Sequence, residues 1–88
     1  MVITEDNIGQ LYWTTAGNIV EITGRAKSPV YYPMFWGAKR NDVNEFIGHI
    51  TFDEIGLIGS DWKELQRARN RDGGKRYESL NYTHPITD

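Results

Sequence analysis

The sequence predicts a mainly β protein: a small antiparallel barrel or sandwich of five short strands, followed by one α-helix. Strand-forming stretches recur at intervals of about ten residues, turn residues separate them, and a helical pattern begins only after residue 60. The length of 88 residues fits a single domain. Within it we expect a β portion over 1–60, a helix over 61–72 and a C-terminal tail over 73–88.

The first two strands are predicted to form a hairpin. The stretch 10–15 (QLYWTT) is rich in aromatic residues and threonine, which favour a pleated sheet. Residues 16–18 (AGN) then offer the positive φ angles that a tight turn requires. In 19–23 (IVEIT), Val20 and Ile22 alternate with polar or solvent-facing positions, so we expect both to point into the core.

Three more predicted strands complete the β portion over 1–60. After a polar loop over 24–28, the apolar stretch 30–36 (VYYPMFW) predicts a third strand, in which Pro33 requires an edge position or a bulge. The remaining segments are a hydrophilic loop (37–44), a fourth strand (45–52) and a short fifth piece interrupted by glycines (55–59). The residues expected to be largely buried are Val20, Ile22, Ile50, Phe52 and Trp62.

The pattern then changes from strand to helix. Asp61 is a candidate N-cap, and Glu64 follows it at the spacing of a capping box. The glycine pair 73–74 is predicted to end the helix. The tail from Lys75 either returns as an extended segment or remains mobile. The residues expected on the inner side of the helix are Trp62, Leu65, Ala68 and Arg69.

Composition excludes several classes of protein. The chain has no cysteine, and therefore no disulfide framework, no thiolate metal site and no cysteine nucleophile. No apolar run approaches the ~18–20 residues that span a bilayer, and the start of the chain does not resemble a signal peptide. With 39% hydrophobic and 12% aromatic residues the chain can form a core. We therefore expect a folded cytoplasmic protein with no membrane partner.

The sequence carries no recognisable catalytic motif. His49 and His84 are the only histidines and lie in unrelated contexts. Asp53 and Glu54 are adjacent, and because neighbouring strand residues face opposite sides, a polar turn is the better interpretation than an acid–base pair. The stretch 73–75 (GGK) lacks the other residues of a phosphate loop. We expect a protein that is not an enzyme and needs no metal or cofactor.

Charge is unevenly distributed along the chain. Residues 1–61 carry a net charge of −4 and residues 62–76 a net charge of +4, in a chain whose total is −2. A basic segment after an acidic body suggests an anionic partner, although a solvated helix face has the same pattern. The candidate partner-binding bases are Lys63, Arg67, Arg69, Arg71, Lys75 and Arg76.

A second candidate surface combines aromatic and basic residues in the middle of the chain. Small barrels bind nucleic acids by stacking bases on exposed aromatic side chains beside lysines and arginines. The alternative, which the small size of the domain favours, is that the aromatic residues fill the core and the bases lie in loops. The residues concerned are Tyr31, Tyr32, Arg25, Lys27, Lys39 and Arg40, next to Phe35 and Trp36.

About sixty residues resemble small accessory proteins encoded by phages and prophages. The resemblance lies in 3–14 (ITEDNIGQLYWT) and 16–22 (AGNIVEI), and continues through Tyr32-Pro33, 51–54 (TFDE) with Gly56, and Ser60 before Leu65. It implies an SH3-like barrel, and it carries over no active-site residue. The helix and tail after Ser60 depart from the pattern of these proteins.

Together these features predict a binding protein. Our first hypothesis is a phage-type accessory protein that binds a host protein, in defence or nucleic-acid metabolism, and inhibits or redirects it. The first alternative is a nucleic-acid-binding regulator that uses the basic C-terminal segment. The second is a protein that sequesters a small nucleotide-like ligand in an aromatic pocket.

Overall fold

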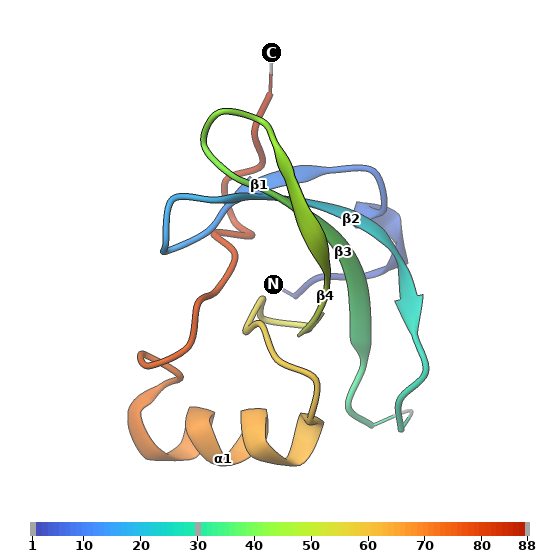
Figure 1. The fold of residues 1–88 in the computed structure, drawn as a ribbon. Coiled ribbons are helices and arrows are strands. Elements are labelled where there is room, and N and C mark those ends of the chain that lie inside the picture. Colours follow the sequence, from blue (N-terminus) through green and yellow to red (C-terminus); the bar gives the residue numbers. More distant parts are fainter. Residues whose placement is uncertain (1, 30, 88) are drawn as a thin grey trace.

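The fold is a four-stranded antiparallel meander with one helix at its end, seen in a computed structural model that describes residues 2–29 and 31–87. The strands lie in the order β1-β2-β3-β4, so that neighbours in sequence are neighbours in the sheet (Figure 1). The elements are the 3-10 helix η1 (Glu5–Asn7), β1 (Leu11–Trp13), β2 (Ile19–Ala26), β3 (Met34–Arg40), β4 (Phe46–Asp53) and α1 (Trp62–Asp72).

The mainly β class and the C-terminal helix are confirmed, but the five-stranded barrel is wrong. In the described residues the sheet has four strands and stays open, with β1 and β4 at its two edges. The predicted fifth strand, 55–59, makes only isolated bridges, from Ile58 to Phe52 and from Leu57 to Ser79. Gly56, with φ of 85°, turns the backbone away from a strand conformation before a ladder can form.

The hairpin between β2 and β3 lies further along the chain than predicted. β2 runs on to Ala26 through the expected polar loop, and β3 extends to Arg40 through half of the expected hydrophilic loop. Pairing explains both shifts, since Arg25 lies opposite Phe35 and Ile19 opposite Arg40. Pro33 precedes β3, where its missing N–H interrupts no ladder. Val30, the predicted start of this strand, lies outside the described residues.

The larger core lies against one face of the sheet. Val20, Ile22 and Phe52 are fully buried, as predicted, whereas Ile50 and Trp62 are only partly buried. No second sheet covers this face among the described residues; the N-terminal segment and the tail do so instead. The buried cluster consists of Ile3, Tyr12, Val20, Ile22, Phe35, Phe52 and Leu80.

The tail returns along the sheet as an extended segment, the first of the two possibilities. It forms isolated bridges from Leu80 to Thr14 and from Ile86 to Leu11. The backbone N–H of Asn81 donates to the carbonyl of Trp13 at 2.8 Å. The tail thus closes the β1 edge (Figure 1, red segment).

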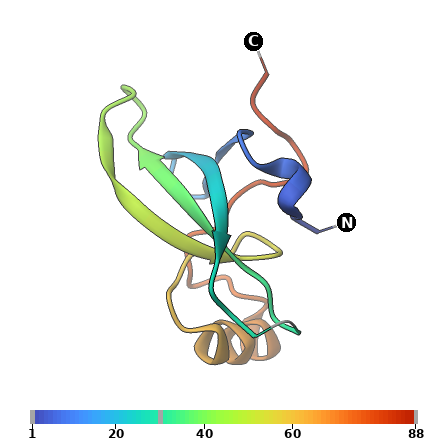
Figure 2. The ribbon, with the colours of Figure 1, turned by 90° about the vertical axis from the view of Figure 1, so that its right-hand side faces the viewer.

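Helix α1 lies beyond one end of the sheet rather than across its face (Figures 1 and 2). Its predicted ends are confirmed: the Asp61 side chain accepts a hydrogen bond from the Lys63 N–H, and Gly73 ends the helix in the left-handed conformation. The buried residues Leu65 and Ala68 face inward. The helix joins a second core formed by Ala26, Tyr32, Met34, Leu57 and Leu65.

Candidate docking surface

A row of basic residues follows the outer face of α1. Lys63, Arg67 and Arg71 are spaced four positions apart and are all exposed, so they lie along one side of the helix. Lys75 and Arg76 continue the exposed positive charge beyond the end of the helix. The Arg76 Nε lies 3.5 Å from Asp72 Oδ2, yet the Arg76 side chain remains 77% exposed.

Arg69, the sixth predicted base, points into the protein instead. Its Nη2 lies 3.2 Å from Oδ2 of Asp53, a residue with no exposed surface, and its guanidinium lies 5.2 Å from the centre of the Tyr32 ring. The inward position agrees with the sequence, because Arg69 follows Leu65 by four positions and so lies on the same side of the helix. The structure therefore separates one structural arginine from five exposed bases.

Two aromatic side chains mark the N-terminal end of the basic row. Tyr31 is 75% exposed, and its ring meets the Trp62 ring edge-on, with 5.4 Å between centroids. The Lys63 Nζ lies 5.6 Å from the centre of the Trp62 ring, a cation–π distance. We call Tyr31, Trp62, Lys63, Arg67 and Arg71 together the docking surface.

The composition of the docking surface is typical of residues that dominate binding energy. Tyrosine, tryptophan and arginine are enriched among such residues because they bury large areas and bring a polar group with them. The nearby acid Glu64 accepts a hydrogen bond from the Tyr77 hydroxyl, which raises the pKa of Tyr77. This contact directs the Glu64 carboxylate toward the segment that follows α1.

The other predicted aromatic and basic residues are scattered over the molecule. Tyr32 is buried, and burial together with the nearby charge of Asp53 raises its pKa to about 12. Lys39 is paired with Glu78, and Arg40 reaches the Asn44 carbonyl at the far end of β3. Sequence proximity did not indicate that Tyr31 meets the helix, since its partner Trp62 lies 31 positions further on.

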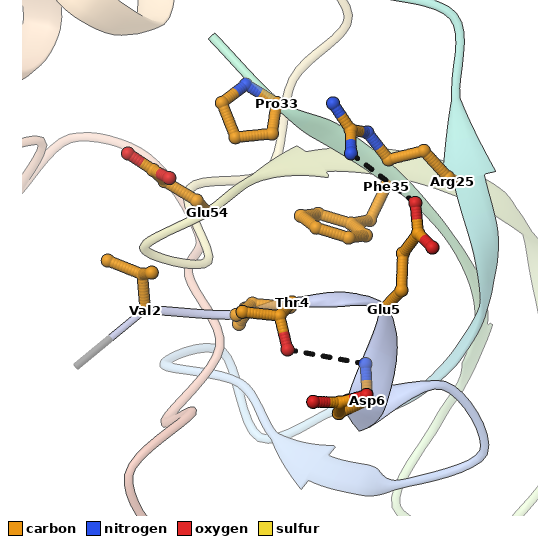
Figure 3. Close-up of a pocket in the computed structure, with 9 residues that line it drawn as sticks. Val2, Thr4, Glu5, Asp6, Arg25, Pro33, Phe35 and Glu54 are labelled. Atoms are coloured by element: carbon orange, nitrogen blue, oxygen red, sulfur yellow. Dashed lines mark hydrogen bonds and ion pairs between the residues drawn. The ribbon is translucent and has the colours of Figure 1, made fainter. Parts of the chain in front are cut away.

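Arg25 and Phe35 line a shallow hollow beside the N-terminal segment (Figure 3). The Arg25 guanidinium lies over the Phe35 ring, and its Nη1 is 3.5 Å from Glu5 Oε1. The hollow holds about 340 Å³ and is also lined by the carboxylates of Asp6 and Glu54. Three carboxylates around one arginine disfavour a phosphate-bearing ligand there.

The two histidines lie far from one another in unlike surroundings. The ring of His49 meets that of Phe46 at 5.2 Å between centroids. The Nδ1 of His84 lies 2.8 Å from the Thr83 hydroxyl. Neither contact is with a carboxylate that would orient a general base.

The part of the chain that the structure describes contains no group of three or more His, Asp or Glu side chains suited to a metal ion. No helix in residues 2–29 and 31–87 is long and apolar enough to cross a membrane. No protein-family model, curated protein or solved structure matches the chain.

Proposed function

We propose that this chain acts by binding an acidic surface of another protein through its docking surface, and not by catalysis. The observation that carries the proposal is the exposed Tyr31, held edge-on against Trp62 at the head of the row Lys63, Arg67 and Arg71. In one contact, the aromatic side chain can bury apolar area while the basic side chains beside it pair with carboxylates of the partner.

The charge distribution supports a protein partner over a long nucleic acid. Residues 1–61 carry a net charge of −4, against +4 in residues 62–76. An acidic body repels an extended phosphate backbone, whereas a compact acidic patch can approach the helix alone. Arg69 adds little to this attraction because Asp53 neutralises it. The resemblance to phage accessory proteins suggests a host protein in the cytoplasm as the partner, which would be inhibited or redirected by occlusion.

A single-stranded nucleic acid is the second candidate. The observation in its favour is the same exposed Tyr31 and its neighbour Trp62, because aromatic rings beside basic side chains also serve as platforms for stacked bases. A nucleic acid would bind with a steep salt dependence. Five phosphate contacts give a slope of log K against log salt of roughly −3.5 on a single strand, compared with roughly −4.5 on duplex DNA.

The test compares two variants of the docking surface with one control. Tyr31→Ala removes the aromatic anchor, and the triple reversal Lys63→Glu, Arg67→Glu, Arg71→Glu removes the charge. Arg40→Glu changes a base at the end of β3 away from α1 and serves as the control (Figure 1). Each purified variant is first compared with the wild type by circular dichroism and a thermal melt.

The wild type is then used to capture a host protein from a nuclease-treated host lysate, and that protein is purified. The binding of each variant is measured to this protein and to labelled single-stranded and duplex oligonucleotides. For the protein, we expect Tyr31→Ala to weaken Kd about tenfold or more and the triple reversal to slow association. Arg40→Glu should stay within about twofold. Submicromolar oligonucleotide binding near physiological salt, abolished by Arg67→Glu with Arg71→Glu, would replace the first candidate with the second.

A further inference from the structure

Trp36 points away from the core although it lies in a central strand of the sheet. Its neighbours in β3, Phe35 and Gly37, face the core, and successive side chains of a strand point to opposite faces. On the outer face, the positions paired with Trp36 are Gly24 in β2 and Thr51 in β4. The paired position in β2 therefore has no side chain to cover the indole, and Trp36 remains 46% exposed.

The Trp36 ring lines a groove of about 310 Å³ between β4 and the segment 58–60, which leads to α1. Ile50 and Ile58 add aliphatic surface to this groove. Among the described residues that line it, none is an aspartate, glutamate, lysine or arginine. The groove therefore combines one exposed aromatic ring with an apolar, uncharged lining.

The side of the groove at Gly59 is fixed by the protein itself. The Gly59 N–H donates to the Thr51 carbonyl at 3.0 Å, and the Thr51 hydroxyl donates to the Gly59 carbonyl at 2.7 Å. On Gly59, a Cβ would lie 2.8 Å from Leu65 Cδ2, so α1 packs closely against this glycine. The groove thus exists before any ligand binds.

Three polar side chains at the groove keep capacity for hydrogen bonds. Among the described residues, no side-chain hydrogen bond involves the His49 imidazole or the Ser60 hydroxyl. The Thr51 hydroxyl uses its proton on Gly59 but keeps lone pairs that can accept. A mostly apolar groove of about 300 Å³ or more with a few polar groups is typical of small-molecule sites.

From these observations we propose that the groove binds a neutral heteroaromatic ring of the nucleobase type, stacked on Trp36. A flat ring covers the exposed indole, and the donors and acceptors on its edge match the polar groups of His49, Thr51 and Ser60. An aliphatic side chain of a partner would leave these three groups without hydrogen bonds. The uncharged lining offers no attraction for phosphate, so the ligand is a base or nucleoside and not a nucleic-acid strand.

The test is a titration of the full chain with adenosine, followed through the amide and indole N–H signals in nitrogen–proton NMR spectra. The chain has three tryptophans, whose indole signals are assigned with single Trp→Phe variants. We expect saturable shifts of the Trp36 indole and of the His49 and Gly59 amides, with a Kd of about 1 mM or below. The Trp13 and Trp62 indoles should not shift.

Two substitutions of Trp36 separate stacking from simple apolar contact. Trp36→Leu keeps an apolar side chain without a ring, and Trp36→Phe keeps a smaller ring. Trp13→Leu is the matched control, because Trp13 is 44% exposed and lies in β1. After folding is checked by circular dichroism, we expect Trp36→Leu to weaken adenosine binding about tenfold or more. The other two variants should stay within about threefold of the wild type.

Adenosine monophosphate and N-acetyl-leucinamide are the comparison ligands. The proposal would be overturned by wild-type spectra without shifts at Trp36, by leucinamide binding as tightly as adenosine, or by the monophosphate binding at least tenfold more tightly. The wild-type shifts decide the matter even where Trp36→Leu does not fold. The triple reversal Lys63→Glu, Arg67→Glu, Arg71→Glu should bind adenosine like the wild type, since none of these residues lines the groove. Failure at the groove is therefore distinct from failure of the docking surface.

Discussion

At the level of single residues, Asp53 connects more of the molecule than any other side chain described above. Its Oδ1 accepts from the backbone N–H groups of Ile55 and Leu57, both at 3.0 Å, which shapes the turn after β4. Its Oδ2 accepts from the Tyr32 hydroxyl at 3.3 Å and faces Arg69 of α1. One carboxylate thus links β4, the approach to β3, and the helix.

We predict that Asp53→Ala lowers the free energy of unfolding by about 3–5 kcal/mol, because it leaves Arg69 without its counter-charge and the N–H groups of Ile55 and Leu57 without their acceptor. Arg69→Met alone should cost less, since Asp53 keeps its three hydrogen bonds. Urea unfolding of both single variants and the double variant measures the coupling. Additive losses, or a loss under about 1 kcal/mol for Asp53→Ala, would contradict this account.

The sequence placed Asp53 correctly beside a polar turn, but not in the interior. A short acidic stretch before Ile55-Gly56 is typical of an exposed turn, and an aspartate is rarely fully buried. Burial becomes acceptable only because Tyr32 and Arg69, 21 and 16 positions away, supply a hydroxyl and a charge. No local pattern contains that information.

At the level of elements, the central strand β3 has a glycine, Gly37, where side chains from β2 and β4 occupy the space beside it. A Cβ at Gly37 would lie 2.6 Å from Val20 Cγ1 and 3.0 Å from Phe52 Cε1. Both neighbours are fully buried, so neither has room to move aside. Gly37 was expected in a loop, and the structure places it in the middle of β3 because strands on both sides pair with it.

Gly37→Ala should therefore destabilise the protein by about 1–3 kcal/mol through overpacking. Gly24→Ala is the matched control in the same sheet, because a Cβ there meets nothing within 4 Å. We expect that control to change stability by less than about 0.5 kcal/mol. Thermal melts of the two variants decide the matter: equal shifts would mean that strand propensity, and not contact with Val20, determines the effect.

At the level of the whole molecule, Glu78 attaches the returning tail to the sheet. Its carboxylate accepts hydrogen bonds from the Thr14 hydroxyl, the Asn18 side-chain amide and the Lys39 ammonium group. Burial by itself would raise the pKa of Glu78, but the hydrogen bonds from Lys39, Thr14 and Asn18 together outweigh it and lower the pKa. The charged form of Glu78 is therefore favoured in the folded state.

A folded-state pKa below the unfolded value of 4.5 means that this stabilisation is present above that value. It is lost as pH falls through the folded-state pKa. We expect Glu78→Gln to cost about 1–3 kcal/mol at neutral pH and to reduce the loss of stability below about pH 4.5. Urea unfolding between neutral and acid pH measures both effects. Glu45→Gln, at an exposed position, should leave the acid-side slope as it is; a shared change in both variants would contradict the role of Glu78.

By itself, the sequence determined the mainly β class, the limits of α1, the inward positions of Val20 and Ile22, and the basic character of the helix. These depend on residues within a few positions of one another, on alternation, capping and local charge. Only the tertiary structure decided that the sheet stays open, that Arg69 meets a buried Asp53 and that Tyr31 meets Trp62. Strand pairing and side-chain contacts join segments tens of residues apart, and their energies depend on which surfaces the folded chain brings together.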